Sequence, residues 1–178
     1  MTTQDPLETI QNLQNAVERL AERVPGFAGY KARETRREAD KLLRVTLAQR
    51  IMEQVQRLSE VQRALLRSGG LRWLDDVEAA VVRLQTLADQ IRTASYGYAG
   101  VFDALKIDEP QLARLYAFDQ QLFAAVDRLA AAIDRLQAAV GQEDFGPALA
   151  DLMRLARETL STFHRREEVL LREDEPRA

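Results

Sequence analysis

The composition describes a chain that can form a hydrophobic core without covalent cross-links. It has 178 residues, of which 46% are hydrophobic and 30% charged, and its net charge is −3 at pH 7. It contains no cysteine, which excludes disulfides, thiolate zinc sites, iron–sulfur clusters and a cysteine nucleophile. The small acidic excess argues against a nucleic-acid-binding surface. No apolar run approaches the roughly 18 residues needed to span a membrane.

Helix signals are clear in the first third of the chain. Asp5 is suited to be the N-cap and Pro6 the first residue of a helix over 6–24, whose apolar residues recur at alternating steps of three and four. A second helix is predicted over 30–68, because no helix breaker occurs before the glycine pair that follows it. At about 1.5 Å per residue this helix is close to 60 Å long, which is unusual for a globular protein.

Three further helices are predicted in the rest of the chain. Their predicted ranges are 71–95, 110–140 and 145–171. Each carries apolar residues at the a and d positions of a heptad repeat, which is typical of helices packed on other helices. Pro110 begins the fourth helix and Gly141 ends it. The charged tail over 172–178 is expected to be disordered.

These elements predict the fold class. Period-two alternation is nowhere sustained, so β-strands are not expected. Short connections favour antiparallel neighbours, and we predict an all-α, antiparallel up-down bundle of about five helices with coiled-coil-like packing, in one domain over 1–178. The second helix is longer than its neighbours. An overhang with an exposed apolar stripe would favour a homodimer.

Two connections between helices resemble each other. Residues 26–29 and 97–100 both follow the pattern Gly-aromatic-Ala-Gly, and in an up-down path they lie at the same end of the bundle. The aromatic rings either cap the core or form a binding surface for a partner or ligand. The aromatic candidates are Phe27, Tyr30, Tyr96, Tyr98 and Phe102.

The start of the second helix is rich in cations. Arg33, Arg36 and Arg37 lie in its first turns, where positive charge opposes the helix dipole. These arginines therefore need partners. Acidic residues of the loop before residue 110 are one possibility, and an anionic ligand or an acidic protein is the other.

Three residues are candidates for a metal site in the bundle interior. Asp119 occupies a core-facing heptad position, and His164 and Glu167 share a face of the last helix. Helical bundles build metal sites from such side chains, but the di-iron pattern requires two histidines and this chain has one. The alternative is that Asp119 pairs with an arginine or sets the register of its helix.

The sequence contains no motif for catalysis or cofactor binding. It lacks a phosphate-binding loop, a dinucleotide-binding fingerprint and a nucleophile elbow. The N-terminus has no secretory signal pattern, so a cytoplasmic protein is expected. We therefore expect a non-enzymatic helical scaffold or adaptor without a cofactor, which binds a protein partner or a second copy of itself. The alternatives are a bundle that binds a small ligand or metal, and a peripheral membrane protein.

Overall fold

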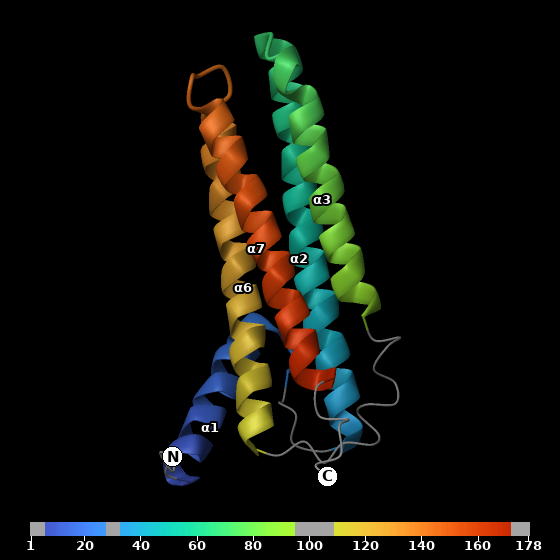
Figure 1. Cartoon of the computed structure of the whole chain (residues 1–178), viewed down its shortest axis with the longest axis vertical. Helices are drawn as coiled ribbons and strands as arrows, with labels where there is room; N and C mark the ends of the chain where they lie inside the picture. The colour runs from blue at the N-terminus through green and yellow to red at the C-terminus, as the bar shows by residue number, and fades with distance from the viewer. Residues whose placement is uncertain (1–5, 28–32, 95–108, 172–178) are drawn as a thin grey trace.

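The computed structural model describes residues 6–27, 33–94 and 109–171, and all regular structure in these ranges is helical (Figure 1). The all-α prediction is confirmed. The helices lie close to the predicted ranges. They are α1 (Pro6–Arg23), α2 (Arg33–Ser68), the short 3-10 helix η1 (Leu71–Trp73), α3 (Leu74–Thr93), α6 (Glu109–Ala138) and α7 (Phe145–Leu171).

The helices α2 and α3 form an antiparallel hairpin. Near its tip, Gln62 Nε2 donates a hydrogen bond of 2.7 Å to Glu78. At its other end, Arg44 Nη1 donates a hydrogen bond of 3.0 Å to the carbonyl of Arg92. The helices α6 and α7 form a second antiparallel hairpin in the same way. The predicted antiparallel packing of chain neighbours is therefore present in both hairpins.

The two hairpins lie side by side and point in the same direction. Helix α2 packs against α6, and α3 packs against α7. The Arg50 guanidinium lies 5.2 Å from the ring centroid of Phe123, and Arg57 donates a hydrogen bond of 3.3 Å to the carbonyl of Ala130. Residue numbers therefore rise together along α2 and α6. The helices are antiparallel within each hairpin, whereas the pairs α2–α6 and α3–α7 between the hairpins are parallel.

The tips of the two hairpins contact each other. Gly69 and Gly141 both have a φ of 79°, a left-handed conformation that lets each of them follow the end of a helix. The ring of Trp73 then packs on Phe145, with 5.6 Å between centroids. A Cβ on Gly146 would lie 2.8 Å from the Trp73 ring, so this close approach requires glycine. The aromatic contact joins the start of α7 to the start of α3.

Helix α1 lies along α6 and runs in the same direction (Figure 1). Arg23 forms an ion pair of 2.6 Å with Asp127, and Gln120 donates a hydrogen bond of 3.4 Å to the carbonyl of Ala16. The carbonyl of Arg23 also accepts a hydrogen bond of 2.9 Å from Arg50 of α2. The up-down alternation therefore begins at α2, because the apolar face of α1 packs on α6 rather than forming an antiparallel pair with α2.

The beginning of α2 extends past the end of α3. It does not project freely in the part with described side chains, because α7 packs beside it. Ala39 and Leu43 are 8% and 0% exposed, and Asp40 forms an ion pair of 2.7 Å with Arg166 of α7. In its described part, the overhang that the sequence predicted as a possible contact for a second copy packs against the chain's own last helix.

Candidate functional site

A buried ionic cluster joins the helices at the end of the bundle opposite the hairpin tips. It consists of Asp40 and Arg44 on α2, Asp119 on α6 and Arg166 on α7. Arg166 Nε donates a hydrogen bond of 2.6 Å to Asp119, and its Nη2 donates one of 2.7 Å to Asp40. Arg44 Nε binds the other oxygen of Asp40 at 2.7 Å. All four residues are at most 3% exposed.

The cluster also reaches α3. Arg44 Nη1 points at the last carbonyls of that helix and donates hydrogen bonds of 3.4 Å to Ile91 and 3.0 Å to Arg92. A guanidinium group is favourable there, because the C-terminal end of a helix carries partial negative charge. Among the described side chains, the two arginines and two aspartates of the cluster carry no net charge. Such a network favours one register of the four helices over others, since every shift would separate buried charges.

The carboxyl of Asp40 feels two opposing influences. Burial raises its pKa, but the guanidinium groups of Arg166 and Arg44 act more strongly together and hold the pKa below its ordinary value of 3.8. The carboxylate is therefore charged in the folded protein at every pH near neutrality. It serves as a hydrogen-bond acceptor for two arginines.

We expect acid to destabilise the protein through this carboxylate. Because the pKa of Asp40 is lower in the folded than in the unfolded state, its contribution to stability is present above the unfolded pKa and is lost as the pH falls through the folded value. The measurement is the midpoint of urea unfolding between about pH 6 and pH 3. The variant Asp40→Asn should start from a lower midpoint and lose less on acidification. An equally steep loss in that variant would assign the acid sensitivity to other carboxylates.

The two metal candidates with described side chains, Asp119 and His164, do not come together. Asp119 is fully buried and binds Arg166, whereas His164 is exposed on α7. The side chain of Glu167 lies outside the described residues. No group of three potential metal ligands occurs among the residues that the structure does describe. The alternative interpretation of Asp119, pairing with an arginine, matches its geometry.

The aromatic and basic candidates are only partly described. Phe27 is 5% exposed and packs edge-on against Tyr116 of α6, with 6.2 Å between ring centroids. It therefore belongs to the core, and the prediction that placed it on a binding surface is corrected. Arg33, Arg36 and Arg37 begin α2, but their side chains lie outside the described part of the chain. The remaining candidates lie outside it entirely, and they are Tyr30, Tyr96, Tyr98 and Phe102.

One hairpin carries an apolar surface that the sequence did not single out. Among residues with described side chains, the exposed large hydrophobic ones all belong to α2, η1 and α3. They are Val45, Met52, Leu66, Leu71 and Val82. Val45, Met52 and Leu66 are spaced by seven and fourteen residues along one face of α2, and we call them the α2 stripe. This spacing is visible in the sequence, but the heptad pattern of the buried residues on the neighbouring face of α2 is stronger and obscures it.

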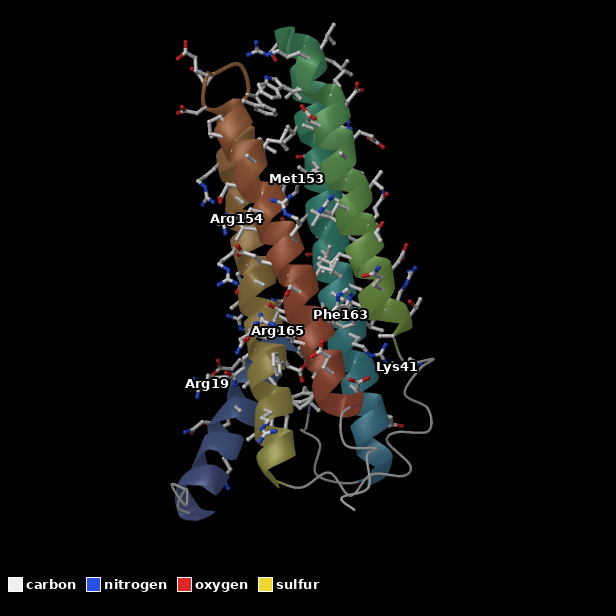
Figure 2. All side chains as sticks on the ribbon, viewed as in Figure 1. Arg19, Lys41, Met153, Arg154, Phe163 and Arg165 are labelled. Atoms are coloured by element: carbon white, nitrogen blue, oxygen red, sulfur yellow. The ribbon has the colours of Figure 1, made fainter. Side chains whose placement is uncertain are left out.

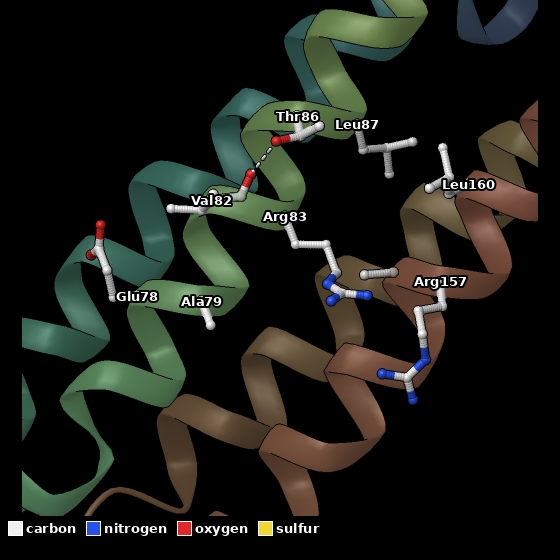
Figure 3. Close-up of a pocket in the computed structure, with 9 residues that line it drawn as sticks. Glu78, Ala79, Val82, Arg83, Thr86, Leu87, Arg157 and Leu160 are labelled. Atoms are coloured by element: carbon white, nitrogen blue, oxygen red, sulfur yellow. Dashed lines mark hydrogen bonds between the residues drawn. The ribbon is translucent and has the colours of Figure 1, made fainter.

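A second surface feature lies between the hairpins. A groove with a volume of about 490 Å³ runs between α3 and α7 (Figure 3). Its apolar lining includes Val82 and Leu87 from α3 and Leu160 from α7. Two arginines, Arg83 and Arg157, lie at the same groove, one from each helix. We call this feature the α3–α7 groove. The sequence could not predict this groove, because α3 and α7 are separated along the chain by the whole of α6.

Comparison with known proteins finds no family model that matches the chain, and no curated protein or solved structure that is significantly similar. Within the described residues, no helix is both long and apolar enough to cross a lipid bilayer. The features of the described residues that bear on function are the ionic cluster, the α2 stripe and the α3–α7 groove.

Proposed function

We propose that the protein is a non-enzymatic helical scaffold that associates with a second copy of itself through the α2 stripe. The observation that carries this proposal is the concentration of exposed large hydrophobic residues on one hairpin. Single exposed hydrophobic residues scattered over a surface are ordinary, whereas an aligned set indicates a contact surface. Val45 is 42% exposed and Leu66 is 57% exposed, so covering them would remove apolar area from water.

The spacing of the stripe favours a helix as its partner. Residues seven apart lie on one line along a helix, which is the arrangement by which helices pack in coiled coils. On the same face, Gln49 and Gln56 are exposed and Ser59 is half-buried. None of these three residues is charged, so a second copy of α2 meets no like charge at the centre of the contact. Arg63 also lies on this face, but toward the end of the stripe.

A second copy fits the stripe when the two α2 helices run antiparallel. With a two-fold axis near Gln56, Val45 of each copy lies opposite Leu66 of the other, and Met52 lies opposite Ser59. The same axis places the Arg63 residues of the two copies at opposite ends of the contact. Such a contact is self-complementary, as the common two-fold symmetric dimers are. The ionic cluster supports the same role, because it fixes four helices in one arrangement and so keeps the stripe constant in shape.

The alternatives have less support. A metal-binding bundle would need Asp119 as a ligand, but Arg166 binds that carboxylate in the folded protein. A small-ligand site in the interior would need space at the ionic cluster, where the four side chains are almost completely buried against one another. A scaffold binds its partners through exposed surfaces, and the α2 stripe and the α3–α7 groove both lie on the surface of this protein.

The test is the mass of the protein in solution. We expect a dimer at about 100 μM protein, and the double variant Val45→Glu with Met52→Glu should weaken dimerisation by about a hundredfold or more, since it places four charges in an apolar contact. Sedimentation equilibrium measures both dissociation constants. The matched control is Val82→Glu with Thr86→Glu on α3, which adds the same charge outside the stripe and should leave the dimer intact. A monomeric wild type, or equal loss in the control, would contradict the proposal.

A further inference from the structure

The α3–α7 groove has the size of a site for one short helix. On α3 its lining extends from Glu78 to Leu87, and on α7 from Ala156 to Leu160. At about 1.5 Å per residue, the α3 side is about 14 Å long, which corresponds to between two and three helical turns. Val82 is 51% exposed at this groove. An apolar side chain entering between α3 and α7 would cover it.

Two of the three charged residues that line the groove are arginines, one on each side. Figure 3 shows Arg83 reaching from α3 toward α7, where Arg157 lies. Both side chains are exposed, and within the described residues neither guanidinium is part of an ion pair. Glu78 lies at the end of the groove and accepts a hydrogen bond of 2.7 Å from Gln62 of α2. Two like charges therefore flank an apolar floor without a described carboxylate to bind them.

Two other exposed arginines of the α6–α7 hairpin, Arg135 and Arg154, differ from this pair. Arg135 and Arg154 both bind Asp151, at 2.7 Å and 2.5 Å, and Arg154 also binds Glu158 at 2.6 Å. Arg154 lies on the outer face of the α6–α7 hairpin (Figure 2). Unlike Arg135 and Arg154, neither Arg83 nor Arg157 forms an ion pair within the described residues, although Glu78 lies at the end of the groove. Acidic groups on a molecule that occupies the groove would complement the net positive charge of its lining.

We propose that the α3–α7 groove binds an acidic amphipathic helix of a partner protein. Its apolar side chains, spaced by three or four residues, cover Val82 and Leu160, and its carboxylates bind Arg83 and Arg157 by charge-assisted hydrogen bonds. The inference deepens the proposed scaffold function and rests on it, since it assigns the scaffold a second partner. A second copy of the chain does not supply this helix through the α2 stripe, because the residues of that stripe carry no carboxylate.

The experiment uses a labelled helical peptide of about three heptads, with leucine at the a and d positions and glutamate at e and g. Glutamate at e and g also prevents the peptide from pairing with itself. Fluorescence anisotropy with the full chain should give a Kd in the micromolar range. A matched peptide with lysine at e and g should bind at least about tenfold more weakly. Equal binding of the two peptides would overturn the proposal, as would no binding of either.

Variants of the chain locate the binding site. Arg83→Glu with Arg157→Glu should weaken binding of the acidic peptide by at least about tenfold and restore binding of the lysine peptide. The control is Arg128→Glu with Arg165→Glu, which makes the same charge change at exposed positions of α6 and α7 and should preserve binding within about twofold. Equal weakening by the control pair would show that only net charge matters and would refute the site.

Folding and self-association are checked in the same samples. If the charge-reversed variant loses helicity, Arg83→Gln with Arg157→Gln replaces it and should weaken binding of the acidic peptide at least about threefold. The Val45→Glu and Met52→Glu variant should bind the peptide as the wild type does, because the α2 stripe lies outside the groove. If the wild type forms a dimer but does not bind the acidic peptide, only the proposed binding site in the groove is refuted. If the wild type is monomeric but binds the peptide, only self-association through the α2 stripe is refuted.

Discussion

Replacing Arg166 by leucine is expected to lower the free energy of unfolding by about 3–5 kcal/mol. Arg166 is 1% exposed and is shared by the carboxylates of Asp40 and Asp119, which come from two other helices. The variant removes one positive charge from a neutral buried cluster and leaves an excess of negative charge there. Urea denaturation at pH 7, followed by far-ultraviolet circular dichroism, measures the change.

A surface ion pair provides the control for this prediction. Asp127 binds Arg23 at 2.6 Å, but the two side chains are 52% and 39% exposed. Asp127→Ala should therefore change the free energy of unfolding by less than about 1 kcal/mol. The double variant Arg166→Leu with Asp119→Leu restores charge balance and should recover about half or more of the loss. A loss of under about 1 kcal/mol for Arg166→Leu would mean that the cluster contributes little.

Local signals account for the part of the fold that the sequence predicts well. The glycine pair after residue 68 and Gly141 end helices in the structure close to where they were expected, because positive φ at Gly69 and Gly141 is a local property of the residue type. The heptad pattern identified Asp119 as core-facing for a similar reason. A polar residue at an apolar heptad position is visible in the sequence, and its burial follows from helix periodicity.

The packing partners of the helices required the structure. The heptad pattern of α1 predicts an apolar face. It does not predict which helix covers that face, and in the structure this is α6, about a hundred residues later. The parallel packing of the two hairpins could not be predicted for a similar reason, since short connections determine only the relative direction of helices that are neighbours in the chain. Arginine is abundant in this chain, so the sequence could not distinguish Arg166 from the exposed arginines of α7. Its carboxylate partners come from two other helices, α2 and α6, which are distant from α7 in the sequence.

The two ends of the bundle are held together by different chemistry. At the hairpin tips the contact is aromatic, between Trp73 and Phe145, and at the opposite end it is the ionic cluster. Both contacts join one hairpin to the other. Because the two hairpins are joined at both ends, we expect the distance between α3 and α7 to stay constant along the groove. The groove and the α2 stripe therefore belong to one body, which the proposed scaffold with two binding surfaces requires.

The middle of the contact between the hairpins depends on Phe123. Its side chain is 0% exposed on α6, and the Arg50 guanidinium of α2 lies 5.2 Å from its ring centroid. Phe123→Ala is expected to lower the free energy of unfolding by about 3–5 kcal/mol, because it leaves a cavity where two hairpins meet. Phe123→Leu retains most of the volume and should cost about 1–2 kcal/mol. Urea denaturation measures both changes.

The shape of the unfolding curve distinguishes two explanations of this loss. If the hairpins form one cooperative unit, Phe123→Ala shifts the midpoint to lower urea and leaves a single transition with an unchanged slope. If the hairpins are stable separately, the variant separates the transition into two and reduces the slope, since less surface is exposed in each step. The ionic cluster and the aromatic contact at the tips both favour the single transition. Two transitions would contradict the inference that this bundle presents its binding surfaces as one rigid body.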